Sequence, residues 1–250
     1  MKGLELFEEK FWRPLSYFGL THHFFNINYS TVVYTWIVIG ILITILIPIY
    51  IILQRKPGLI HFIVTSFINY FVDLSKQSLG FFSLTHFTFV TAIFTFIALC
   101  NSISLLPWME EPTKDLNTTL ALGIISFLYI QFYSIKTNGL KAYVKEYFHP
   151  FFIMFPLNVV GKLASVISLS FRLFGNIFGG VIIAKIYFGA IEGSWLTEIF
   201  GIPLGLAITS FFGLFEGFLQ AFVFTMLTIT YLSTAVAKKS KTPTKSGEAA

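Results

Sequence analysis

The chain is built from long apolar blocks separated by short polar segments. Five blocks are long enough to cross a hydrocarbon core of roughly 30 Å as helices, which takes about 17 to 25 residues. They lie at residues 32–53, 81–106, 118–135, 150–188 and 195–237. Each of the last two would extend about 60 Å at 1.5 Å per residue. These two helices must therefore tilt strongly, lie along another protein or project from the membrane.

Residues 58–78, between the first two blocks, are less hydrophobic. Their apolar side chains follow mostly helical spacing, at Phe62, Phe67, Phe71 and Leu74. A helix with one apolar face lies along a membrane surface. The pattern therefore predicts an all-α, polytopic membrane protein with about five transmembrane helices plus an interfacial helix, the last two transmembrane helices being long and strongly tilted.

Charges between the blocks orient the predicted helices. Basic residues follow the first and third blocks, at Arg55, Lys56, Lys136, Lys141 and Lys145. The segment after the second block has a formal charge of minus two, from Glu110, Glu111, Lys114 and Asp115. Because basic flanks stay in the cytoplasm, the N-terminus is expected outside and the C-terminus inside. We interpret the chain as an external N-terminal segment at 1–30, a single transmembrane domain at 31–237 and a flexible basic tail at 238–250, with no evident removable signal peptide.

The composition agrees with a membrane protein. Hydrophobic residues make up 55% of the 250 residues and charged residues 12%, and the mean hydropathy is +0.77, far from a soluble composition. A membrane β-barrel would alternate every second residue, and this chain does not. The formal charge of +5 does not indicate nucleic acid, because the basic residues lie at segment ends and in the tail. We expect membrane lipid as a partner and no nucleic acid.

Ordinary catalytic motifs are missing from the sequence. It contains no glycine-rich phosphate loop, no nucleophile elbow and no Cys or His set at metal-ligand spacing. Cys100 is its only cysteine. We therefore expect no cofactor, no metal and no catalysis by this chain alone.

The most informative segment surrounds Arg172, about midway along the block at 150–188. An arginine at the centre of a membrane helix costs roughly 3 kcal/mol by insertion scales, so it should face protein or water. Steps of three and four residues place small and polar residues in one stripe with it. These residues are Gly161, Ser165, Ser168, Asn176, and Gly179 or Gly180.

A second stripe of small and polar residues lies in the last block. Its members are Gly205, Thr209, Gly213, Glu216, Gly217 and Gln220. Small residues let helices approach closely and polar ones bond across them, so the two stripes predict an aqueous or partner-facing groove. The structural alternative is that Arg172 pairs with Glu216 only to hold two helices together. A buried ion pair is often a poor stabiliser, which favours a functional role.

Three segments together resemble one family. Residues 168–180, SLSFRLFGNIFGG, look like the signature of the F-type ATP synthase a subunit. Residues 112–122, PTKDLNTTLAL, resemble that family's outer loop and following helix, and residues 220–228, QAFVFTMLT, resemble a segment near its C-terminus. The resemblance covers roughly residues 31–237 in order.

This resemblance implies a stator subunit of the rotary ATP synthase membrane sector, in a bacterial cytoplasmic (inner) membrane or, alternatively, a mitochondrial inner membrane. The implied partners are the c-subunit ring, the b-subunit peripheral stalk and the remainder of the complex. Two ion half-channels would reach the ring carboxylates from opposite sides, with Arg172 as the gate between them and Asn176 and Gln220 flanking it. Translocation of protons, or of sodium ions, would thereby be coupled to ring rotation and ATP synthesis.

The chain departs from the usual family pattern at several positions. Relatives often carry an acid nine residues after the arginine, and His or Glu seven residues before the glutamine, where this chain has Val181 and Gly213. Glu216 lies about one turn beyond Gly213, and we hypothesise that it replaces the missing half-channel group. Lys162 stands where bacterial relatives commonly have glutamate, and Lys185 adds another base. Both lysines can snorkel, or they can alter proton capture.

Two other functions stay open on the sequence alone. A secondary transporter with Arg172 as its anion site predicts broken helices or an internal repeat, and neither is visible in the sequence. A purely structural assembly subunit predicts that ion conduction survives when Arg172 and Glu216 are neutralised together.

Overall fold

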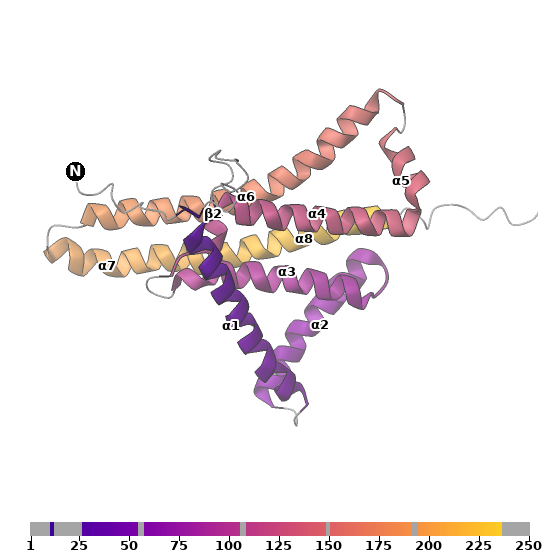
Figure 1. The fold of residues 1–250 in the computed structure, drawn as a ribbon. Coiled ribbons are helices and arrows are strands. Elements are labelled where there is room, and N and C mark those ends of the chain that lie inside the picture. The colour runs from indigo at the N-terminus through magenta and orange to yellow at the C-terminus, as the bar shows by residue number, and fades with distance from the viewer. Residues whose placement is uncertain are drawn as a thin grey trace, which may run out of the picture.

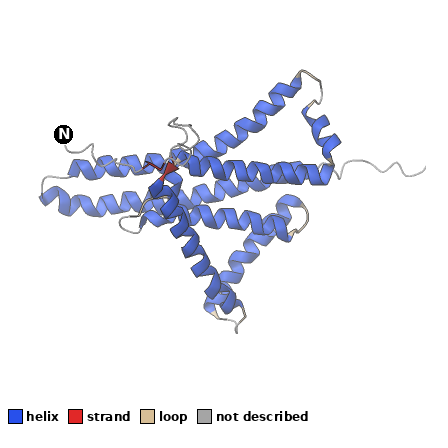
Figure 2. Ribbon diagram, viewed as in Figure 1, coloured by secondary structure: helices blue, strands red, loops and turns tan. Residues whose placement is uncertain are grey.

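The structure, a computed structural model, describes residues 11–12, 27–54, 58–105, 109–148, 151–191 and 195–236. Nearly all of this is helix (Figure 2). The exceptions among ordered elements are β1 (Phe11–Trp12) and β2 (Ile27–Asn28), which pair antiparallel with Phe11 opposite Asn28. The sequence pattern did not predict this two-residue pairing.

Within the described residues, five helical stretches are long and apolar enough to cross a membrane, as predicted. They are α1 (Tyr29–Leu53), α3 (Leu84–Ser102), α4 (Leu116–Asn138), α6 (Met154–Ile191) and the stretch Gly201–Val236. The last stretch belongs to a helical run in three parts: α7 (Trp195–Ser210), the π-helical segment η6 (Phe211–Glu216) and α8 (Gly217–Val236). We call this run the C-terminal helix.

Shorter helices connect the spans. The predicted interfacial helix is α2 (Leu59–Leu79), which ends at Gly80 with a left-handed φ of +75°. The 3₁₀ turns η4 (Ile103–Leu105) and η5 (Pro112–Lys114) lead into α4, whose N-terminus is capped by Asp115 accepting from the amide of Asn117. Helix α5 (Leu140–Tyr147), which the sequence pattern did not predict, precedes α6.

The C-terminal helix and α6 run antiparallel along the length of the molecule, with α3 and α4 beside α8 (Figure 1). Helices α1 and α2 extend away from this group and form a V whose point lies farthest from it (Figure 1). The main core lies where α2, α3, α6 and α8 meet, around fully buried side chains that include Phe71, Ile97, Leu173, Phe224 and Ile229. This core fixes α6 against α8 at their middles.

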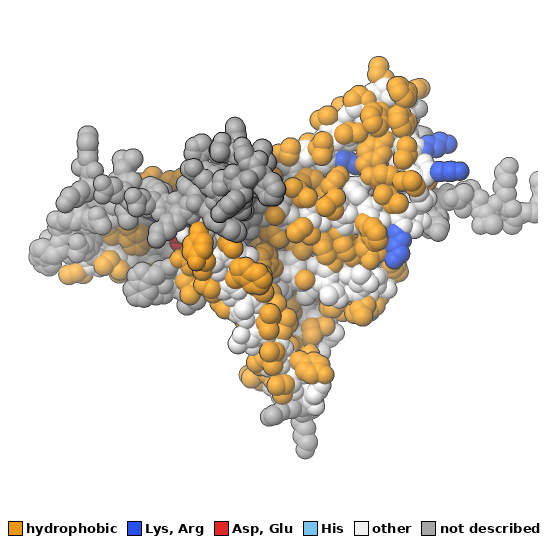
Figure 3. Space-filling view, in the orientation of Figure 1, with side chains coloured by type: hydrophobic (Ala, Val, Ile, Leu, Met, Phe, Trp, Pro, Cys, Tyr) orange, Lys and Arg blue, Asp and Glu red, His pale blue; other side chains and the backbone are white. Residues whose placement is uncertain are grey.

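Basic side chains are unevenly distributed over the surface of the molecule. Figure 3 shows Lys and Arg side chains gathered at the end of the molecule where α4 ends and α5 lies, and hydrophobic side chains over most of the remaining described surface in that view. Lys141 and Lys145 on α5 are exposed. Following the positive-inside rule, we call this the inner end, and we call the side of the molecule at which α4 begins, next to η5, the outer end.

Several predictions concern residues that the structure does not describe. They are the basic stop at Arg55 and Lys56, the link at 192–194, the tail at 238–250 and most of the segment at 1–30. The proposed domain boundaries at 30–31 and 237–238 stay predictions.

Candidate ion-translocation site

Arg172 lies near the middle of α6, eighteen residues after the first residue of the helix and nineteen before its last. Its side chain is exposed, whereas Leu169 and Leu173 are buried in the core. The guanidinium therefore leaves α6 on a face that the described chain does not cover. Within the described residues no ion pair joins Arg172 to Glu216, so the purely structural pair is not formed.

One turn along α6 from Arg172, Asn176 reaches across to α8. Its Nδ2 donates a 2.9 Å hydrogen bond to Oε1 of Gln220. Gln220 is only 3% exposed, and its Nε2 has no hydrogen-bond partner among the described residues. A buried donor without an acceptor costs about 1–3 kcal/mol, so this amide is placed to bond a further acceptor.

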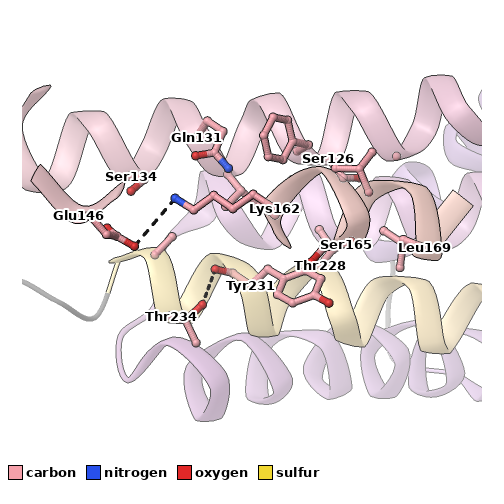
Figure 4. Close-up of a pocket in the computed structure, with 15 residues that line it drawn as sticks. Ser126, Gln131, Ser134, Glu146, Lys162, Ser165, Leu169, Thr228, Tyr231 and Thr234 are labelled. Carbon is pink, nitrogen blue, oxygen red and sulfur yellow. Dashed lines mark hydrogen bonds and ion pairs between the residues drawn. The ribbon is translucent and has the colours of Figure 1, made fainter. Parts of the chain in front are cut away.

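A cavity of about 240 Å³ lies at the inner end between α4, α5, α6 and α8 (Figure 4). We call it the inner cavity. Nine of the fifteen described residues that line it carry polar side chains: Ser126, Gln131, Ser134, Glu146, Lys162, Ser165, Thr228, Tyr231 and Thr234. Leu169 is the lining residue of α6 nearest in sequence to Arg172. Hydroxyl and amide groups at this density can hold a chain of water molecules.

A larger cavity, of about 840 Å³, lies at the outer end between residues 109–114, α6 and the C-terminal helix. We call it the outer cavity. Its charged and hydroxyl-bearing lining residues are Glu110, Glu111, Lys114, Lys185 and Thr209. Lys114 Nζ forms a 2.5 Å ion pair with Glu110 Oε2, and Glu111 is 7% exposed. The outer cavity therefore holds both carboxylates and cations.

The two cavities reach different stretches of the same pair of helices. On α6 the inner cavity touches residues between 162 and 169, and the outer cavity touches residues between 177 and 189. On the C-terminal helix the corresponding stretches are 228–235 and 209–213. Arg172, Asn176 and Gln220 lie in the interval that neither cavity reaches.

The positions at which the sequence departs from its family are divided between the cavities. Val181, Gly213 and Lys185 all line the outer cavity, and Lys162 lines the inner one. Glu216 is half-buried at the end of η6. The hydrogen bonds of a π-helix run between residues five apart, so its turn is wider than the α-helical turn assumed for the spacing from Gly213.

Sequence reasoning missed a buried amide that joins three elements. Asn101, at the end of α3, is fully buried; its Nδ2 donates to the carbonyl of Gly217 at 2.8 Å, and its Oδ1 accepts from Thr113 Oγ1 at 2.6 Å. It therefore ties the loop before α4 to the start of α8. An asparagine next to a run of apolar residues was the available signal.

The described residues contain no group of three or more His, Cys, Asp or Glu side chains arranged to hold a metal. The polar groups around Arg172 are a guanidinium and two amides. Such groups can bind a carboxylate and relay hydrogen bonds, but they cannot supply the anionic ligands that a divalent cation needs.

Comparisons with known proteins identify the family of this chain. Residues 32–233 match the family model of the ATP synthase A chain. The chain is 35% identical to ATP synthase subunit a of Moorella thermoacetica over 83% of this chain and 91% of that relative. It is 32% identical to ATP synthase subunit a of Desulfosudis oleivorans over 82% and 87% of the two chains, and 28% identical to ATP synthase subunit a 2 of Acaryochloris marina over 84% and 86%. The chain therefore belongs to the ATP synthase A chain family, as a membrane subunit that is not catalytic on its own.

Proposed function

We propose that this chain is the ion-translocating stator subunit of a rotary ATP synthase, in which Arg172 separates two ion half-channels and faces a ring of c subunits. The inner and outer cavities are the half-channels of this proposal. Ions enter from one cavity, travel on the rotating ring and leave through the other. Its further partners are the peripheral stalk and the rest of the complex, in a bacterial cytoplasmic membrane.

One observation carries the proposal. Arg172 is exposed near the midpoint of a 38-residue apolar helix, between the stretch of α6 that lines the inner cavity and the stretch that lines the outer cavity. Leaving that guanidinium against lipid would cost roughly 3 kcal/mol or more. A partner surface with carboxylates at the same depth removes this cost. The cost would remain if Arg172 faced lipid or had a purely structural role.

The chemistry of arginine suits a gate. Its guanidinium stays protonated at any ordinary pH, so it can attract an ionised ring carboxylate and cannot pass protons itself. The positive charge also opposes a hydrated proton that moves straight from one cavity to the other. Transport then requires the ring carboxylate to leave Arg172, take up an ion from one cavity and return after rotation.

Asn176 and Gln220 are proposed to orient this exchange. The 2.9 Å hydrogen bond between them fixes the Gln220 carbonyl, which leaves the buried Nε2 as the free donor of that side chain. Because this donor is buried between α6 and α8, it bonds the ring carboxylate only when the Gln220 side chain turns toward the ring, and it then adds no second charge. Removing the amide of Gln220 should therefore slow the exchange without abolishing it.

Glu216 stays a proposed ion-collecting residue of the outer half-channel. Val181 and Gly213 leave their parts of the outer cavity without an ionisable group, and Glu216 lies at the end of the helical segment that contributes Gly213. Glu216 itself is not among the described residues that line the outer cavity, whereas Glu110 and Glu111 line it and supply a second source of carboxylates.

The test compares wild type with Arg172→Ala and the matched control Lys141→Ala in inverted vesicles that contain the whole complex. Lys141 is an exposed base on α5 that lines neither cavity. We expect ATP-driven acidification to be lost in Arg172→Ala and kept in Lys141→Ala, with equal amounts of assembled complex. Pumping at a near wild-type rate in assembled Arg172→Ala vesicles would contradict the proposal.

The alternatives give different results in the same vesicles. A structural pair predicts that the double variant Arg172→Ala with Glu216→Gln pumps as well as wild type. A secondary transporter predicts uptake of an anionic solute that needs no ATP and no ring. The rotary proposal predicts neither result.

A further inference from the structure

We propose that Glu146 is the carboxylate that exchanges protons between the inner cavity and the solvent, and that Lys162 is a positioning residue that holds it there. This inference rests on the proposed function, because it gives the inner half-channel its ionisable group. It assigns that role to α5, an element outside the membrane spans.

The lining of the inner cavity singles out Glu146. Among the described residues that line the cavity, it is the only carboxylate and Lys162 is the only basic one. The other polar lining groups are hydroxyls and amides, which relay a proton but do not store one near neutral pH. Glu146 and Lys162 have side chains that are 31% and 30% exposed, so both reach solvent as well as the cavity.

Contacts on three sides hold the Lys162 ammonium group. Its Nζ lies 3.9 Å from Oε1 of Glu146, 4.0 Å from the centre of the Tyr147 ring and 5.1 Å from that of Tyr143. Each ring face attracts the cation by about 0.5–2 kcal/mol. Figure 4 shows the Lys162 side chain extended from α6 toward Glu146 on α5.

The same tyrosines fix α5 to the rest of the bundle. The Tyr143 hydroxyl donates to Oε1 of Gln131 on α4 at 2.8 Å and lies 2.7 Å from the Tyr147 hydroxyl. Asn158 on α6 donates to the Tyr147 carbonyl at 2.9 Å. Burial, with the Tyr147 hydroxyl bond, raises the pKa of Tyr143 to about 12, so this hydroxyl stays protonated and keeps donating.

The proton step needs no further reactant. In the synthesis direction the Glu146 carboxylate accepts the translocated proton from a hydronium ion in the cavity, which becomes water, and the neutral carboxylic acid then releases that proton to a solvent water at the inner surface, which becomes hydronium. The carboxylate is restored after each transfer. In ATP-driven pumping the two transfers run in reverse.

A merely structural pair predicts something else. Ion pairs that are partly open to water contribute about 0–1 kcal/mol to stability. If the pair were only structural, Glu146→Asp and Glu146→Gln would therefore both change stability slightly and pump alike. A proton carrier is replaced by any carboxylate that reaches the same place and by no neutral isostere. The difference between Glu146→Asp and Glu146→Gln therefore separates the two roles.

The experiment measures ATP-driven acidification of inverted vesicles and passive proton flux through the membrane sector after removal of the catalytic sector. We expect Glu146→Gln to lower both rates at least about tenfold, with normal assembly. Glu146→Asp and the exchange variant Glu146→Lys with Lys162→Glu should recover much of the rate. Lys145→Gln, an exposed neighbour on α5, is the matched control and should pump like wild type.

Chemical replacement gives an independent readout. Cys100 is fully buried, so Glu146→Cys adds the accessible thiol of this subunit. Alkylation with iodoacetate restores a carboxylate there, whereas iodoacetamide adds a neutral amide of the same size. Recovery with iodoacetate alone is expected; equal effects of the two reagents would overturn the proposal, as would wild-type rates in Glu146→Gln. If Arg172→Ala abolishes pumping while Glu146→Gln does not, this inference fails and the proposed function stands.

Discussion

Replacing Gly180 with alanine should force α6 away from the C-terminal helix. A Cβ on Gly180 would lie 2.7 Å from Cβ, 2.8 Å from Cγ and 2.9 Å from Cδ1 of Phe212. Carbon atoms pack at roughly 3.5–4.0 Å, so the closest contact is short by about 0.8 Å. Because the Phe212 Cβ is bonded to the main chain, no side-chain rotation moves it away. The two helices must separate.

The cost follows from two opposing effects. Overpacking of this kind costs about 1–3 kcal/mol, and glycine to alanine in a helix gains about 0.5–1 kcal/mol. We expect a net loss of about 1–2 kcal/mol. Function should suffer as well, because Asn176 lies one turn from Gly180. Lengthening its 2.9 Å bond to Gln220 by about 0.8 Å would break it.

The assay is the half-life of ATP-driven pumping in heated vesicles, together with the initial pumping rate before heating. The control is Gly161→Ala on the same helix, where a Cβ meets nothing within 4 Å. We expect Gly180→Ala to shorten the half-life and lower the rate, and Gly180→Val to do both more strongly. If Gly180→Ala matches Gly161→Ala in both measurements, the close approach of α6 to η6 is wrong.

Two further predictions concern stability. Asn101→Leu should leave the Thr113 hydroxyl without its acceptor, at about 1–3 kcal/mol, remove the hydrogen bond to the Gly217 carbonyl, and shorten the thermal half-life of the complex. Asn69→Leu, at an exposed position of α2, is its control, and equal half-lives for the two variants would contradict the network. Asp115→Ala should remove the N-cap of α4 at about 0.5–2 kcal/mol, whereas Asp115→Asn should retain most of the stability. Thermal inactivation of both complexes measures this difference, and identical losses would show that capping is not the reason.

The membrane-spanning helices were predictable because a bilayer imposes one requirement on every span. Each needs a long apolar run, and each run is visible in the sequence without knowledge of its neighbours. The predicted and observed ends differ by only a few residues: the block predicted at 118–135 corresponds to helix α4 at Leu116–Asn138. Helical spacing also placed Asn176 and Gln220 in two polar stripes, and one hydrogen bond now joins a member of each.

The pairing of Glu146 with Lys162 was not predictable in the same way. It depends on how α5 packs against α6 across a short connection, and no periodicity in the sequence carries that information. Lys162 alone looked like a departure from the family pattern. Its partner became visible only when the fold placed Glu146 3.9 Å away.

The π-helical segment η6 was equally hidden, since six residues of ordinary helical composition gave no sign of it. Its consequence concerns the length of the chain. One residue more or less in a helix turns everything beyond it by about 100°, because 3.6 residues complete a turn. A π-helical turn takes up one extra residue without that rotation, because its hydrogen bonds run between residues five apart. Deleting a residue between 211 and 216 would restore regular α-helix and leave both the outer-cavity face and Gln220 turned toward α6. The residue count between Gly205 and Gln220 can therefore change by one within η6, whereas a deletion elsewhere in this helix would rotate one face relative to the other.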